Sequence, residues 1–121
     1  MNFTFDNDRP IYVQLVEQLK LYIVSGKLEA GIRLPSVREL ALKTQVNPNT
    51  MQKALIELEN ERLIYTERTN GKFVTSDQER IEYVKKELAN KKVQIYLYDM
   101  EKLGVSNEQA IEYLQKLGGR K

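Results

Sequence analysis

The stretch that most constrains the fold of this chain is residues 34–58, which reads as two short helices joined by a tight turn. Pro35 and Ser36 open the first of these helices. Ser36 and Glu39 have the spacing of a capping box, in which each side chain satisfies an unpaired N–H at the helix start. Residues 44–46 form the expected turn. The pattern predicts a helix-turn-helix.

The second helix of this pair has a clear start signal. Asn47 can cap the helix with its side-chain oxygen, and Pro48 suits the first helical position, where no N–H is needed. The helix is expected to run to about Glu61, with an apolar back and a polar leading end. The apolar residues are Met51, Ala54, Leu55 and Leu58, and the polar ones are Asn49, Thr50, Gln52 and Lys53. Such a helix suits insertion into a DNA major groove, where amides pair with adenine edges and a lysine favours guanine or phosphate.

Elements on either side complete a domain around these helices. Pro10 opens an earlier helix with an apolar stripe, and Ser25 and Gly26 close it. Beyond the helix pair, the β-rich residues 63–65 and 72–74 flank Thr69-Asn70-Gly71. Asn-Gly between such runs is a strong hairpin signal. Together these elements predict a winged helix-turn-helix.

The pattern changes after residues 75–77. Glycine and proline are absent from Asp77 to about Leu103, so we expect a long helix that Ser76 or Asp77 caps and Gly104 ends. A second capping box at residues 106–109 opens a short final helix. Two such helices alone bury little apolar surface, so we expect them to pair with the same helices of a second subunit. The residues expected at this dimer interface are Ile81, Val84, Leu88, Val93, Tyr96, Leu97, Met100, Ile111 and Leu114.

The predicted fold is therefore mainly α with a small β-hairpin. A winged helix-turn-helix DNA-binding domain is expected over residues 1–76, followed by a two-helix dimerisation tail over residues 77–121.

Composition narrows the function classes. The chain has neither histidine nor cysteine, which removes the commonest general base, the commonest metal ligand and any disulfide. We therefore expect no catalytic residues, no cofactor and no metal site. Neither a bilayer-spanning apolar run nor a signal peptide is present, which predicts a soluble, cytoplasmic protein without a membrane partner. The net charge is only +2, so a DNA-binding face must come from local placement of charge.

Further candidate DNA contacts lie outside the second helix of the pair. Arg38 projects from the first helix of the pair, where the alternative is a solvated surface arginine. The hairpin tip offers Arg68, Asn70, Gly71 and Lys72, which would form a wing along phosphates or in the adjacent minor groove. Glu67 opposes this interpretation because it places a negative charge beside Arg68.

Several of these motifs, taken in order, resemble one family. They are Pro10-Ile11-Tyr12-x-Gln14, Leu34-Pro35-Ser36-x-Arg38-x-Leu40-Ala41, Val46-Asn47-Pro48-Asn49-Thr50 and Gly71-x-Phe73-Val74. This set resembles the GntR family of transcriptional regulators, and the short tail is similar to that of the YtrA subgroup. The resemblance implies a homodimeric bacterial repressor that binds a palindromic operator in double-stranded DNA, often one controlling an ABC-transporter operon. Its implied DNA contacts are Arg38, Asn47, Asn49, Thr50, Gln52 and the wing around Gly71.

Four positions depart from the family pattern. Gln45 and Arg62 stand where glycines are usual, at the turn and after the helix that would read DNA, and both would need a left-handed backbone. Glu67 and Thr69 replace the usual arginine and glycine of the wing.

Two other function classes remain as alternatives. A winged helix can serve as a protein-interaction module that does not touch DNA, which the near-neutral charge and Glu67 favour. An enzyme would have to rely on carboxylates or lysines, and no constellation of them is visible. A small-molecule effector is a further candidate partner, with a crevice between the reading domain and the tail as its expected place.

Overall fold

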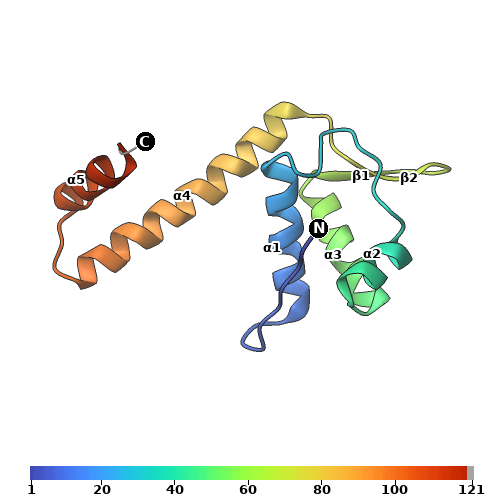
Figure 1. Cartoon of the computed structure of the whole chain (residues 1–121). Helices are drawn as coiled ribbons and strands as arrows, with labels where there is room; N and C mark the ends of the chain where they lie inside the picture. Colours follow the sequence, from blue (N-terminus) through green and yellow to red (C-terminus); the bar gives the residue numbers. More distant parts are fainter. Residues whose placement is uncertain (120–121) are drawn as a thin grey trace. The chain divides into compact units, whose positions relative to one another are not determined.

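The computed structural model describes residues 1–119, so Arg120 and Lys121 of the expected tail lie outside the described residues. Within this range the order of elements is three helices, a β-hairpin and two further helices (Figure 1). Their bounds are α1 (Ile11–Val24), α2 (Val37–Thr44), α3 (Pro48–Asn60), β1 (Ile64–Glu67), β2 (Gly71–Val74), α4 (Gln78–Lys102) and α5 (Asn107–Gly118). None of these helices is both long and apolar enough to span a membrane.

The chain divides into two compact units, Met1–Lys85 and Lys86–Lys121. The first two turns of α4 therefore belong with the first unit, nine residues beyond the expected boundary at residue 76. Ile81 and Val84 explain this placement, since their exposed fractions are only 7% and 2% in the single chain. Both belong to the core of the first unit, which corrects the expectation that they lie at a dimer interface.

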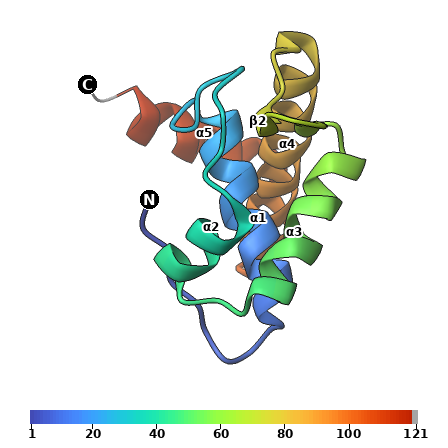
Figure 2. The same ribbon diagram turned by 90° about the vertical axis from the view of Figure 1, so that its right-hand side faces the viewer.

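The core of the first unit forms around α3, which packs along α1 and against α2 (Figure 2). The apolar face of α3 is fully buried, and its residues Met51, Ala54, Leu55 and Leu58 all have 0% exposure. Leu15, Leu19 and Ile23 of α1 face them, each 2% exposed or less. Burying one such aliphatic side chain contributes about 1.5–3 kcal/mol, so this contact fixes the rotation of α3 about its axis.

The turns around α2 and α3 form as their sequences predict. The Ser36 hydroxyl accepts a hydrogen bond from the Glu39 N–H at 3.1 Å, and the capping box is complete. Gln45 ends α2 with φ 57°, and Arg62 follows α3 with φ 61°. Both side-chain-bearing residues thus adopt the left-handed backbone expected of them, a conformation that costs about 1 kcal/mol relative to glycine.

The hairpin is longer than the sequence suggests. β1 pairs with β2 in antiparallel register from Ile64 opposite Val74 to Glu67 opposite Gly71. The loop is therefore residues 68–70, and Gly71, with φ 95°, already belongs to the strand. Ile64 and Val74 are buried beneath the sheet, whereas Tyr65 and Phe73 stack on its other face with ring centroids 5.5 Å apart.

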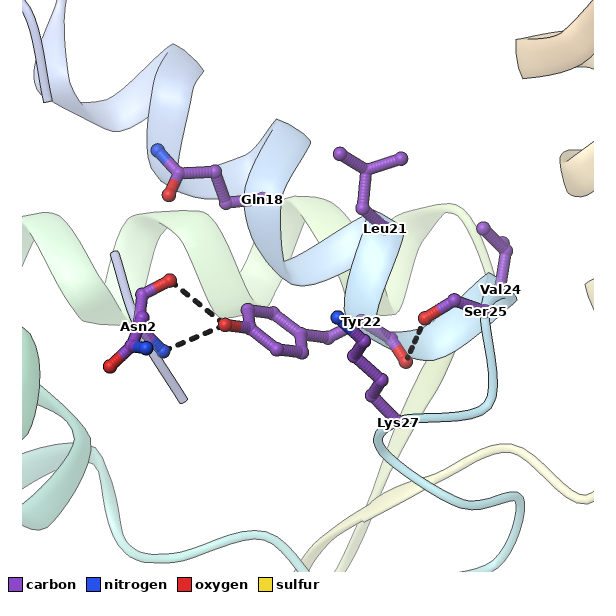
Figure 3. A pocket seen from close by; sticks show the side chains of 7 residues that line it. All are labelled: Asn2, Gln18, Leu21, Tyr22, Val24, Ser25 and Lys27. Atoms are coloured by element: carbon purple, nitrogen blue, oxygen red, sulfur yellow. Dashed lines mark hydrogen bonds between the residues drawn. The ribbon is translucent and has the colours of Figure 1, made fainter. Parts of the chain in front are cut away.

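The extended segment that precedes α1, residues 2–6, runs alongside this helix, which no sequence pattern predicted. Three side chains of one α1 face, spaced four residues apart, bind the backbone of every second residue of this extended segment. The spacings match because one helical turn of four residues rises about 6.0 Å and two extended residues advance about 6.6 Å. The hydrogen-bonded pairs are Asn2 with Tyr22, Thr4 with Gln18 and Asp6 with Gln14, each joined through both backbone N–H and C=O (Figure 3 shows the first).

The second unit consists of the rest of α4 and α5. Gly104, with φ 81°, ends the turn after α4, and the Ser106 capping box with Gln109 opens α5. The Tyr96 hydroxyl donates a hydrogen bond of 2.7 Å to the Ala110 carbonyl, and the Ala110 side chain is fully buried. This hydrogen bond and the buried Ala110 join α4 and α5 at one point.

Replacing Gln14 with alanine is expected to lower the free energy of unfolding by about 2 kcal/mol, because three hydrogen bonds to Asp6 and Arg9 are lost at a 3% exposed site. Gln18→Ala is the matched control, since it removes the equivalent bonds to Thr4 at a more exposed position. Urea denaturation of both variants measures the difference. If both variants lost the same free energy of unfolding, burial would not explain the contribution of Gln14.

Candidate nucleic-acid interface

The leading end of α3 presents its polar side chains to solvent. The Asn47 side chain accepts a hydrogen bond of 2.8 Å from the Asn49 N–H, so Asn47 serves as the helix cap. Asn49 and Gln52 are exposed, and Thr50 is half-buried. Since the opposite face of α3 is locked in the core, these side chains point away from the first unit. Their amides are free to pair with base edges in a groove.

Lys53 is exposed but has a defined position. Its ammonium lies 4.4 Å from the centroid of the Tyr12 ring in α1. A cation over an aromatic face gains about 0.5–1 kcal/mol at an exposed site. The contact holds the ammonium at the start of α1, beside the polar end of α3.

Arg38 is the second residue of α2, and its side chain is exposed. It lines a shallow groove together with Gln45 and Pro48. Within residues 1–119 it forms no ion pair, so its guanidinium is available to a phosphate or a base.

The wing residues divide into two groups. Arg68, in the loop, is exposed and lies outside the ion pairs formed within residues 1–119. Asn70 is also exposed, but its side chain donates a hydrogen bond of 3.0 Å to Glu67. Glu67, whose negative charge was expected to oppose DNA binding by Arg68, thus accepts a hydrogen bond from the hairpin loop.

The ammonium of Lys72 does not point into solvent, where the sequence predicted a contact with DNA. Its ammonium donates a hydrogen bond of 2.9 Å to Thr66 and lies 3.4 Å from a carboxylate oxygen of Glu59 in α3. Its side chain is only 17% exposed. The reason is strand alternation, which points residues 66 and 72 of the paired strands to the same side of the hairpin, where α3 ends. We therefore assign Lys72 to anchoring the wing and remove it from the candidate DNA contacts.

Arg33 is a residue near the wing that sequence reasoning missed. It precedes α2, forms an isolated bridge with Phe73 of β2, and its guanidinium lies beside Gly71. The only local signal was an arginine in a short segment between two helices, and its pairing with a strand 40 residues later was not readable from that segment.

Residues 1–119 contain no group of three or more acidic side chains that could hold an ion together.

Comparison with known proteins decides the family. Residues 11–74, more than half of the chain, match the model of the bacterial regulatory proteins of the gntR family. The chain belongs to the GntR family. This GntR-family chain is a DNA-binding transcriptional regulator and not an enzyme, and its winged helix-turn-helix is the fold predicted from the sequence.

Individual relatives agree with this assignment. The transcriptional repressor YtrA of Bacillus subtilis is 35% identical, over 93% of this chain and 91% of its own length. A solved GntR-family regulator from Listeria monocytogenes is 44% identical with a TM-score of 0.86, covering 93% of this chain and 98% of that one. A structure of AraR(DBD) in complex with the operator ORX1 is 26% identical with a TM-score of 0.56, covering 62% of this chain and 96% of that one.

Exchanging Lys72 for methionine in this GntR-family regulator is expected to lower the free energy of unfolding by about 1 kcal/mol, because the wing loses its contacts with Glu59 and Thr66. The salt dependence of DNA binding is expected to stay unchanged. Arg68→Met removes the same charge from the exposed loop. It should leave the free energy of unfolding unchanged and flatten the salt dependence of DNA binding. Thermal melts and binding titrations at two salt concentrations test the pair, and a flattened salt dependence in the Lys72 variant would contradict the assignment.

Proposed function

We propose that this regulator binds a palindromic operator in double-stranded DNA as a homodimer and acts as a repressor. The observation that carries the proposal is the outward-facing polar end of α3, with Asn49 and Gln52 exposed while its back is fully buried. Inserted into the major groove, this end would read bases, and Arg38 and Arg68 would bind the flanking phosphates.

The apolar surface of the second unit supports the homodimer. Val93 of α4 is 49% exposed, and Ile111 and Leu114 of α5 are each 50% exposed. Leu88, Tyr96, Leu97 and Met100 are only half-buried. Contiguous apolar residues on both helices favour a symmetric partner that covers them, because a contact between identical surfaces is closed and self-limiting. Two α3 helices would then sit about one DNA turn, roughly 34 Å, apart.

The relatives support the finer regulatory reading. YtrA is named a transcriptional repressor, and AraR(DBD) is seen bound to an operator. Control of an ABC-transporter operon follows from the family resemblance and is part of the proposal. The small-molecule effector stays a prediction.

Selection of bound duplexes from a random pool tests the proposal directly. A recovered palindrome would support base reading and dimerisation together. Failure to retain any duplex would contradict DNA reading and favour the alternative of a protein-interaction module, for which the net charge of only +2 is the supporting observation.

Changing Gln52 to alanine is expected to relax base preference at one position of each half-site by about 10-fold, since a bidentate amide–base contact discriminates by roughly 1–3 kcal/mol. Asn60→Ala is the matched control, because Asn60 is exposed at the other end of α3. Binding to operator variants measures the effect. Unchanged specificity in the Gln52 variant would rule out its role in base reading.

The double variant Ile111→Glu and Leu114→Glu is expected to convert the dimer into a folded monomer, because two half-exposed apolar side chains become charged at the interface. Gln94→Glu adds a charge at an exposed α4 position outside the apolar stripe and should leave the dimer intact. Sedimentation equilibrium measures the mass of each. A dimeric double variant would contradict this interface.

A further inference from the structure

We propose that Arg33 is a further DNA-contacting residue, which binds a backbone phosphate in the groove between the start of α2 and the hairpin loop. The inference rests on the proposed operator binding and adds a contact from a segment outside both the helix-turn-helix and the hairpin. It also gives the base of the wing a basic side chain that can bind a phosphate, since the ammonium of Lys72 is paired with Glu59.

Backbone pairing fixes where Arg33 lies. The segment before α2 runs along β2, with the Leu34 N–H donating to the Lys72 carbonyl at 2.8 Å and the Val74 N–H donating to the Ile32 carbonyl at 2.9 Å. Arg33 therefore stands directly opposite Phe73, as a third strand would place it. Opposite residues of an antiparallel pair project to the same face, so Arg33 shares the outer face of the hairpin with the stacked Tyr65 and Phe73.

The side chain of Arg33 extends along this face toward the loop. A Cβ atom built on Gly71 would lie 3.5 Å from Arg33 Nε and 3.6 Å from Nη2. The guanidinium thus rests against the one residue of β2 that has no side chain, and Gly71 also needs its positive φ of 95° there. Strand pairing at one end and this close contact at the other restrict the side chain before any ligand arrives, which lowers the entropy lost on binding.

The groove around Arg33 carries charges of both signs. It lines a groove with Ser36, Arg68 and Gly71, and two carboxylates, Glu39 and Glu67, also border that groove. Both carboxylates accept hydrogen bonds from close neighbours, Glu39 from the Ser36 N–H and Glu67 from the Asn70 amide.

Arg33 itself forms no ion pair within the described part of the chain. An arginine fork matches the oxygens of a phosphate in a bidentate arrangement, so a DNA phosphate fits this groove.

The test compares Arg33→Ala, Arg33→Lys and Lys27→Ala in the full chain, using a duplex recovered by selection with the unaltered chain. Lys27 lies just beyond the C-terminal end of α1, about 20 Å along the helix from Tyr12 at its start. Replacing Lys27 with alanine lowers the net charge by one unit, as replacing Arg33 does. Dissociation constants are measured at several salt concentrations, and far-ultraviolet circular dichroism with thermal melts reports folding.

Arg33→Ala is expected to weaken binding by about 10-fold for each half-site and to reduce the salt slope by roughly 0.9 per subunit, since one phosphate contact is lost. Arg33→Lys should recover the slope, and Lys27→Ala should change neither quantity. If Arg33→Ala does not fold, Arg33→Lys still decides, because loss of the bidentate fork predicts weaker binding at an unchanged slope.

Binding by Arg33→Ala equal to that by Lys27→Ala, or weaker binding with an unchanged slope, would overturn the phosphate contact while leaving operator binding intact. If the unaltered chain retains no duplex in the selection, it is the proposed function that fails.

Discussion

The burial of one face of α3 is the contact on which the rest of the structure depends. Met51, Ala54, Leu55 and Leu58 have no exposed surface, and α1 and α2 supply the side chains against them. A helix locked on one side over its whole length can present only its other side. The same packing that stabilises the domain therefore also aims Asn49 and Gln52 outward, so the stability of the domain and the proposed reading of DNA have a single cause.

The far end of α3 organises the hairpin in the same way. Glu59 binds Lys72 and Thr66 of the wing, and Glu61 binds Lys20 of α1 at 2.8 Å. The Arg80 Nε donates a hydrogen bond of 2.8 Å to the Glu61 carbonyl, which ties the first turn of α4 to the same point. These pairs are partly buried, so they are screened less than surface pairs and fix geometry more than they add stability. The wing is thereby held at a set distance from the reading end.

Local signals were readable from the sequence, whereas contacts between distant segments were not. The caps at Ser36, Asn47 and Ser106 and the left-handed backbone at Gln45 each depend on a few neighbouring residues, and all of them form as predicted. The inward turn of Lys72 depends on strand register against the end of α3. The burial of Ile81 and Val84, the position of Arg33 and the ladder ahead of α1 likewise require knowing which segments meet. The expected hairpin was right in kind, but its loop moved because Gly71 pairs with Glu67.

The distribution of charge explains how a chain with a net charge of +2 can have a surface suited to DNA. Around α2, α3 and the hairpin, carboxylates form contacts within the protein: Glu59 and Glu61 bind lysines, Glu39 completes a helix cap and Glu67 accepts a hydrogen bond from Asn70. The arginines of the same region, at positions 33, 38 and 68, form no ion pairs within residues 1–119 and are exposed. The carboxylates thus have partners within the protein, although Glu39 and Glu67 border the same groove as Arg33 and Arg68. Because screening limits exposed charges to a range of about 10 Å, the local field at a docked phosphate depends on these arginines and the carboxylates beside them, and not on the total.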